Sequence, residues 1–302
     1  MNPFVSSLTS CELCPRKCGV NRQQGQRGYC RAGSVAEVFR YGLHHGEEPP
    51  ISGTRGSGTI FFSRCTLKCL YCQNYPWSQE GQGRAVEGGE LAASLEKMAT
   101  DGCHNWNWVS PTPWLPWIYE AWEKAVKTGH ARPNVYNTSG FERVEVLRAM
   151  ENWVNVYLTD LRYARSDSAQ QGSDCPAYVE VARAALLEMW RQTGPLKMDD
   201  EGIATRGTIC RLLVLPGRAD EAVANLEWLA ESVGTGIPVS VMAQYTPAYR
   251  ALERSPWSRR PTAEEYGRVV EAVERLGFAD GWVQEYDTPT PENLVGFKMS
   301  PG

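Results

Sequence analysis

Short apolar runs alternate with helical patterns along most of the chain after residue 58. The apolar runs have the length and composition of buried strands, and they lie at 59–63, 106–110, 134–137, 154–158, 208–215 and 239–243. Apolar residues at helical spacing follow them at 90–99, 115–126, 141–150, 178–191, 222–231 and 263–276, and a last short candidate strand lies at 282–285. This alternation predicts parallel strands that are joined by right-handed helical crossovers.

The number of strand–helix units predicts the architecture. We expect an α/β fold with a full or partial (β/α)6 TIM-like barrel of parallel strands. In such a barrel, the residues that carry chemistry lie at the carboxyl ends of the strands. The expected strand ends carry Ser110, Asn137, Asp160 and Pro216. These four residues are therefore expected to surround one mouth of the barrel.

The first 50 residues lack this alternation. They are rich in Cys, Gly, Arg and Gln, and they predict a loop-dominated extension that binds a metal. The segment 46–58, G-E-E-P-P-I-S-G-T-R-G-S-G, is typical of a connector. We therefore predict a Cys-rich metal-binding extension at 1–50 and a core barrel with a C-terminal tail at 51–302.

Composition and charge exclude several classes of protein. The hydrophobic content of 42% allows a sizeable core in a chain of 302 residues. The formal net charge of -4 and the mixing of both signs along the chain favour neither nucleic acid nor a membrane as a partner. No apolar run approaches the roughly 20 residues that span a bilayer, and the N-terminus lacks the pattern of a signal peptide. We therefore expect a cytoplasmic protein.

Ten cysteines in a chain without a secretion signal argue against a disulfide framework. Cys11, Cys14, Cys18 and Cys30 form one group, and Cys65, Cys69 and Cys72 form another. The remaining cysteines are isolated and are expected to act as small buried hydrophobic residues, namely Cys103, Cys175 and Cys210.

The second group lies in a loop directly after the first expected strand. A structural zinc site needs four ligands, and His104 is the later candidate for a fourth. Three thiolates instead suit a four-iron cluster that leaves one iron open for a small molecule. Cys65, Cys69 and Cys72 are therefore predicted to hold a [4Fe–4S] cluster.

The C-x3-C-x2-C pattern, with Tyr71 before its third cysteine, resembles the radical S-adenosylmethionine (radical SAM) superfamily. Further segments resemble its uncharacterised branch that is labelled pyruvate formate-lyase activating enzyme-like. These segments are S-R-C-T-L-K-C-L-Y-C-Q-N, P-P-I-S-G, V-S-P-T-P, V-Y-N-T-S-G, Y-L-T-D-L-R-Y, R-L-L-V-L-P-G and Q-Y-T-P-A-Y. The resemblance covers nearly the full length of the chain.

The resemblance implies an activity and its cofactors. S-adenosylmethionine (SAM) would bind the open iron, and an electron from the reduced cluster would cleave it to methionine and a 5′-deoxyadenosyl radical. That radical would abstract hydrogen from a small-molecule or protein substrate, and a flavodoxin- or ferredoxin-type protein would supply the electron. Two alternatives stay open: an activase that acts on a glycyl radical enzyme, and a non-catalytic Fe–S or zinc protein that transfers electrons or binds partners.

The resemblance also suggests which residues contact SAM. Tyr71 would lie near the adenine, although packing within the loop explains it equally well. The superfamily commonly has Gly-Gly-Glu after the second strand, where this chain has S-P-T-P, so a hydroxyl or carbonyl would bind the ammonium group of SAM. Asp160 could instead cap a helix, and Arg211 could form a surface ion pair. The full predicted set is Tyr71, Asn74, Ser110, Thr112, Asn137, Thr138, Asp160, Arg162, Arg211 and Pro216.

The first cysteine group predicts a second metal site. Four thiolates within twenty residues make a closed site, which suits either structural zinc or a second Fe–S cluster. Neighbouring Arg and Lys residues would offset the negative charge of four thiolates.

Overall fold

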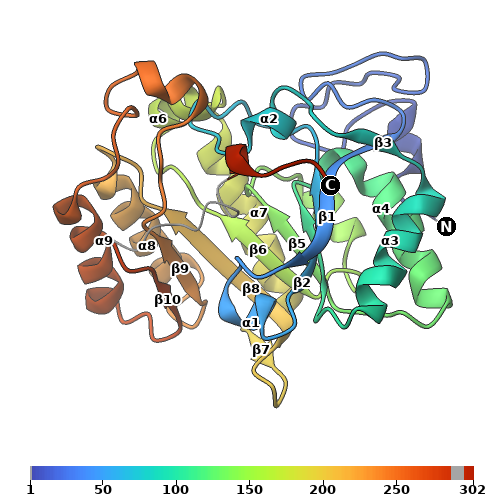
Figure 1. Cartoon of the computed structure of the whole chain (residues 1–302). Helices are drawn as coiled ribbons and strands as arrows, with labels where there is room; N and C mark the ends of the chain where they lie inside the picture. Colours follow the sequence, from blue (N-terminus) through green and yellow to red (C-terminus); the bar gives the residue numbers. More distant parts are fainter. Residues whose placement is uncertain (1, 287–295) are drawn as a thin grey trace.

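The computed structural model describes residues 2–286 and 296–302. Its strands form one sheet in the order β10-β9-β8-β6-β5-β4-β2-β1-β3, and β7 pairs with β8 (Figure 1). The strands are β1 (Ala36–His44), β2 (Ser57–Phe62), β3 (Arg84–Val86), β4 (Trp106–Val109), β5 (Asn134–Thr138), β6 (Val156–Asp160), β7 (Lys197–Met198), β8 (Ala204–Leu213), β9 (Val239–Met242) and β10 (Gly281–Val283).

The central part of the sheet is parallel. Strands β2, β4, β5, β6, β8, β9 and β10 pair in parallel with one another, in the reverse of the order given above. Every residue of β2, β4, β5 and β9 is buried, as expected for parallel strands that are covered on both faces. The predicted α/β class is confirmed. In the described part of the chain the sheet runs from an edge at β10 to an edge at β3, which is consistent with a partial barrel and not with a closed one.

Helices connect the parallel strands and cover the sheet. Helices α3 and α4 lie on one side of the molecule in Figure 1, and α8 and α9 lie on the other. The predicted helices all form, with small shifts at their ends. The helices are α1 (Pro49–Ser52), α2 (Tyr75–Ser78), α3 (Gly88–Thr100), α4 (Leu115–Lys127), α5 (Val144–Ala149), α6 (Ser166–Ser173), α7 (Tyr178–Thr193), α8 (Ala219–Ser232) and α9 (Ala263–Leu276), with 3-10 turns η1 (Val5–Leu8), η2 (Thr112–Trp114), η3 (Tyr249–Glu253) and η5 (Gly296–Lys298).

The prediction that residues 1–50 are dominated by loops is wrong for residues 36–44. These residues form β1, which pairs antiparallel with β2 on one side and with β3 on the other. The run A-E-V-F-R-Y-G-L-H contains a glycine and only one β-branched residue, so its local strand signal is weak, and pairing on both sides stabilises it. The division of the chain at residue 50 stays a prediction, and β1 lies in the same sheet as the predicted barrel strands.

The segment 46–58 is not a solvent-exposed connector. It contains α1 and the start of β2, and Ile51 is fully buried. Glu48 precedes α1 and is only 7% exposed, because its carboxylate binds Arg211 of β8. The glycines and prolines of this segment therefore shape a turn that lies against the sheet.

Within the described ranges, no helix combines the length and the apolar content that crossing a bilayer would require.

Candidate functional site

The loop that carries Cys65, Cys69 and Cys72 follows β2 and is fixed against α6. The Leu70 backbone N–H donates to the Gly172 carbonyl at 2.9 Å, and the Lys68 N–H donates to the Ser173 carbonyl at 3.3 Å. A side chain at Gly172 would lie 2.3 Å from the hydroxyl of Tyr163, so this close approach requires glycine. The loop conformation is therefore set by contacts with a segment about a hundred residues later in the chain.

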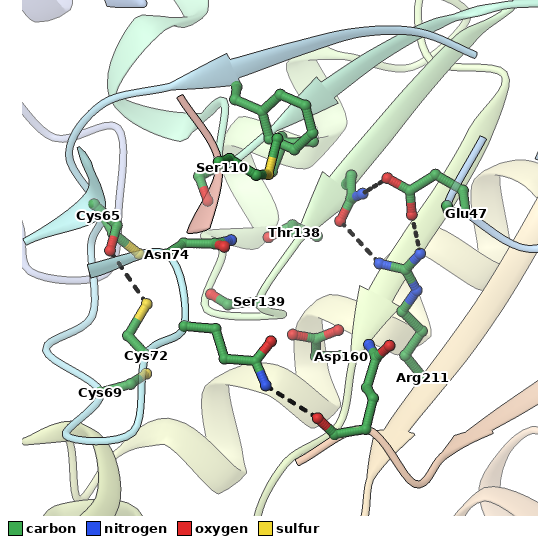
Figure 2. A pocket seen from close by; sticks show the side chains of 18 of the residues that line it. Glu47, Cys65, Cys69, Cys72, Asn74, Ser110, Thr138, Ser139, Asp160 and Arg211 are labelled. Carbon is green, nitrogen blue, oxygen red and sulfur yellow. Dashed lines mark hydrogen bonds and ion pairs between the residues drawn. The ribbon is translucent and has the colours of Figure 1, made fainter. Parts of the chain in front are cut away.

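The three cysteines of this loop line one pocket at the carboxyl ends of the parallel strands (Figure 2). Cys69 is buried, and Cys65 and Cys72 are partly exposed to the pocket. On the side of the pocket away from the cysteines lie Glu47 and Arg211. The pocket thus places three thiols at one end and the Glu47–Arg211 pair at the other.

Hydrogen-bond donors surround the sulfur atoms. Arg162 Nη1 donates to Cys69 Sγ at 3.0 Å, and the same guanidinium donates to Asp160 Oδ2 at 3.0 and 2.6 Å. The hydroxyl of Ser173 lies 3.0 Å from Cys69 Sγ, and that of Ser78 lies 3.2 Å from Cys72 Sγ. A guanidinium beside a sulfur favours the thiolate, which is the form that binds metal.

The pKa values of the thiols show what metal binding must overcome. Burial raises the pKa of Cys65 to about 12 and the pKa of Cys72 to about 11. At neutral pH these thiols are therefore protonated when no metal is bound, and a bound metal must displace their protons. Within residues 2–286 and 296–302, no three His, Cys, Asp or Glu side chains are spaced to hold a single metal ion.

His104 does not supply a fourth ligand to this loop. It precedes β4 and therefore lies at the amino end of that strand, whereas the cysteine loop follows the carboxyl end of the parallel strand β2. Its Nε2 accepts the backbone N–H of Arg55 at 3.1 Å, and its Nδ1 lies 3.0 Å from Arg55 Nη2. The zinc alternative with His104 as a ligand is therefore wrong.

Most of the predicted SAM-contacting residues line the pocket. They come from the cysteine loop and from the ends of β4, β5, β6 and β8, as the barrel model predicts. Ser110 has a φ of +56°, a backbone conformation that is uncommon outside glycine and that recurs at functional sites. The lining members of the set are Asn74, Ser110, Asn137, Thr138, Asp160, Arg162 and Arg211. Their roles in binding a cofactor stay predictions.

Tyr71 and Pro216 lie outside the lining of this pocket. The Tyr71 ring is buried and stacks on Trp257, with ring centroids 5.2 Å apart, and its hydroxyl lies 2.7 Å from that of Tyr163. This position matches the packing role that the sequence also allowed for Tyr71. Pro216 belongs to the turn after β8. The backbone N–H of the following residue, Gly217, donates to the carboxylate of Glu265. That turn is tied to the start of α9.

Thr112 is also absent from the lining, and its hydroxyl turns toward a buried carboxyl group. Thr112 Oγ1 donates to Glu142 Oε1 at 2.6 Å, and Thr138 Oγ1 donates to the same oxygen at 2.5 Å. The other oxygen of Glu142 is buried and has no hydrogen-bond partner in the described chain. Burial raises the pKa of Glu142 to about 7. Glu142 thus holds Thr138 in place from behind the pocket.

We expect Glu142→Gln to reduce the pH dependence of stability. The pKa of Glu142 in the folded chain lies above its ordinary value of 4.5, so its proton stabilises the folded state. That contribution is fully present below about pH 4.5 and is lost as the pH rises to about 7. The free energy of unfolding is measured with urea at pH 5 and at pH 8 for both proteins. Between pH 5 and pH 8, the wild type should lose about 2–4 kcal/mol more of this free energy than the variant. Parallel pH profiles for the two proteins would contradict this account.

Sequence reasoning missed a buried ion-pair network beside the pocket. Glu47 binds Arg211, and Arg211 Nε and Nη2 donate to the two oxygens of Glu48 at 2.8 and 2.7 Å. Glu47 Oε1 also accepts the side-chain amides of Asn107 and Asn137 at 2.9 and 3.2 Å. Arg211 is therefore in a buried pair and not in the surface pair that the sequence left open. His44 and Met299 are further lining residues that no motif indicated, and Gln244, from the Q-Y-T-P-A-Y segment, also lines the pocket.

The first cysteine group packs close to the second. Arg16 Nε donates to the Thr66 carbonyl at 3.4 Å, and Arg16 Nη2 donates to the Asp174 carbonyl at 2.9 Å. The hydroxyl of Tyr29 donates to the Asp174 carboxylate at 2.8 Å. The segment that contains Cys11, Cys14, Cys18 and Cys30 is therefore fastened to both the cysteine loop and the end of α6.

The chain is similar to a curated protein and to several solved structures. No family model matches it. It is 29% identical over 275 residues to "Uncharacterized protein MJ0674" of Methanocaldococcus jannaschii. The aligned region covers 88% of this chain and 75% of that protein. Among solved structures, it is similar to "Native anSMEcpe with bound AdoMet", with a TM-score of 0.48, 10% identity and coverage of 70% of this chain and 57% of that one. It is also similar to the FeFe-hydrogenase maturase HydG of Carboxydothermus hydrogenoformans, with a TM-score of 0.48 and 14% identity. The similar region covers 79% of this chain and 55% of that one. The chain thus spans a little over half the length of these two solved structures.

Proposed function

We propose that the chain is a radical SAM enzyme. The observation that carries this proposal is the convergence of Cys65, Cys69 and Cys72, from one loop, with strand-end polar side chains in a single pocket. A [4Fe–4S] cluster on these thiolates would supply the electron that cleaves SAM reductively, and the resulting 5′-deoxyadenosyl radical would abstract hydrogen from the substrate.

The chemistry of the donor set fits this pair of cofactors. Thiolates are the ligands that hold iron–sulfur clusters, and hydrogen bonds to the ligand sulfurs tune such clusters. Arg162 donates to Cys69 Sγ, and the hydroxyl of Ser173 lies within hydrogen-bond distance of the same sulfur. The hydroxyl of Ser78 lies within hydrogen-bond distance of Cys72 Sγ. These residues would hold the cluster ligands in place and offset the charge of the Cys69 thiolate.

The remainder of the pocket suits a polar organic molecule next to the thiols. Ser110 and Asn137 offer a hydroxyl and an amide group from adjacent strand ends, Thr138 lines the pocket beside them, and Asp160 offers a carboxylate that Arg162 fixes in place. These groups would bind and orient SAM, while the fully buried strands β2, β4 and β5 exclude water from one side.

The chemical identity of the substrate separates two finer versions of the proposal. In the first, the radical acts on a small molecule that shares the pocket with SAM. In the second, the enzyme is an activase and the radical acts on a glycine of a partner protein. A non-catalytic Fe–S or zinc carrier is the rival to both, and it needs no polar strand ends beside the thiols. Seven predicted polar residues do lie there, which supports the enzyme.

Binding of SAM distinguishes the enzyme from the carrier. We expect the anaerobically reconstituted chain to bind about one equivalent of labelled SAM in equilibrium dialysis, because the cluster keeps one iron open. Cys65→Ala/Cys69→Ala/Cys72→Ala should bind none. Cys103→Ala is the matched control, since Cys103 is a buried cysteine outside the pocket, and it should bind like the wild type. Absence of binding by a wild-type chain that holds its cluster would favour the carrier.

A further inference from the structure

Arg22 is a buried cation that lies beside the first cysteine group. It is only 1% exposed. Its Nε donates to the Gly33 carbonyl at 2.8 Å, and its Nη1 donates to the Pro113 carbonyl at 2.7 Å. The guanidinium lies 5.2 Å from the ring centroids of both Trp114 and Trp117. These contacts fix the side chain in one orientation at the junction between the N-terminal segment and the turn after β4.

The charge of Arg22 has no carboxylate partner in the described part of the chain. Its Nη2 is buried and has no hydrogen-bond acceptor there. Glu37, the acidic residue whose charge reaches Arg22, forms its ion pairs with Arg64 and Arg27, at 2.7 and 3.5 Å. A buried guanidinium without a counter-charge is strongly unfavourable, so an anionic group is expected next to it.

The groups that face Arg22 are thiols. Cys11 and Cys30 pack against the same core cluster as Trp114, whose ring the Arg22 guanidinium contacts, and the charge of Arg22 reaches both thiols. Cys14 and Cys18 belong to the same segment, in which the Cys11 N–H donates to the Val20 carbonyl and the Gly19 N–H donates to the Cys11 carbonyl. These backbone hydrogen bonds fold the chain back on itself and bring the stretch that carries Cys14 and Cys18 next to Cys11.

We propose that Cys11, Cys14, Cys18 and Cys30 bind a thiolate-liganded metal centre, and that Arg22 is the counter-charge that positions it. Four thiolates around a divalent zinc ion carry a net charge of about -2, and four thiolates around an oxidised four-iron cluster carry the same charge. Either centre would pair with the unsatisfied Nη2 of Arg22. In the described structure the thiols are not yet at ligand spacing, so metal binding would draw them together.

This centre would also anchor the barrel mouth. Arg22 holds the carbonyl of Pro113, which lies between Thr112 and Trp114 in η2, directly after the strand that ends near Ser110. Arg16 of the same N-terminal segment holds the Thr66 carbonyl in the other cysteine loop. The proposed centre therefore connects two of the loops that shape the pocket.

The test uses Zn²⁺ as the probe and the full chain in the Cys65→Ala/Cys69→Ala/Cys72→Ala background. Competition with a chromophoric chelator should show one tight zinc equivalent, which the further change Cys11→Ala/Cys30→Ala abolishes. Arg22→Gln should weaken zinc binding about 10–100-fold, as changes around metal ligands commonly do, and Arg22→Lys should recover part of the affinity. Arg27→Gln is the matched control, because Arg27 lies in the same segment but is half exposed, and it should bind zinc like the parent.

The outcomes separate the metal centre from the role of Arg22. No tight zinc equivalent, or binding that survives Cys11→Ala/Cys30→Ala, would overturn the site. An Arg22→Gln variant that binds zinc with parental affinity would overturn the role of Arg22. If Arg22→Gln is unfolded without metal, it is titrated with Zn²⁺ while its circular dichroism is followed. Refolding at the zinc concentration that saturates the parent would then contradict the role of Arg22 as counter-charge. Refolding only at higher zinc concentrations would support that role. Iron and sulfide analysis of the same anaerobic background variant, as purified, tells a cluster from zinc.

Discussion

Replacing Cys69 with alanine is expected to remove the cluster from the 65–72 loop. After anaerobic reconstitution, the variant should contain about four fewer iron atoms per chain than the wild type, because two remaining thiolates cannot retain a four-iron cluster. Cys69 is the critical position, since it is buried and its sulfur accepts from Arg162 at 3.0 Å. Iron and sulfide assays, with the visible absorption spectrum, give the measurement. SAM cleavage by the variant should fall to background.

Two matched variants make this result specific. Cys103→Ala and Cys210→Ala each remove a buried thiol that does not line the pocket, and both should retain the wild-type iron content. If Cys69→Ala kept the full iron content, the assignment of the cluster to this loop would be wrong. If Cys103→Ala also lost iron, loss of stability and not loss of a ligand would explain the result.

Replacing Arg211 with methionine is expected to destabilise the chain by about 3–5 kcal/mol, because it leaves buried carboxylates without their partner. Arg211 is 13% exposed, and it holds Glu47 and Glu48, whose side chains are 7% and 5% exposed. Urea unfolding at neutral pH measures the effect. Arg275→Met is the control: Arg275 forms an exposed pair with Glu227 at 3.1 Å, so its loss should cost at most about 1 kcal/mol.

A compensating variant tests the physical cause. Removing the two carboxylates together with the guanidinium, in Glu47→Gln/Glu48→Gln/Arg211→Met, should recover part of the lost stability, since no buried charge is then left unpaired. Equal stability of Arg211→Met and Arg275→Met would show that the network contributes no more than a surface pair.

The sequence predicted the parts of the molecule that depend on local patterns. Strands such as β2 and β4 are short, contain β-branched and aromatic residues, and precede amphipathic helices, so the strand–helix alternation is visible in the residues themselves. Because parallel strands all end at the same edge, Ser110, Asn137 and Asp160 could be placed together before any contact was known.

The parts that could not be predicted depend on contacts between distant segments. Nothing near Glu48 indicates that its partner is Arg211, 163 residues later. The strand β1 forms because β2 and β3 pair with it, and its own composition is weak. Thr112 and Thr138 both look like strand-end hydroxyls, and both donate to the buried carboxyl group of Glu142, yet only Thr138 lines the pocket.

The most direct test of the account is the formation of 5′-deoxyadenosine. The reconstituted chain is reduced with dithionite under anaerobic conditions and mixed with SAM, and the products are separated and quantified. The account predicts 5′-deoxyadenosine and methionine from the wild type and from Cys103→Ala, and none from Cys65→Ala/Cys69→Ala/Cys72→Ala. A wild-type chain that holds its cluster, binds SAM and still forms no 5′-deoxyadenosine would contradict it.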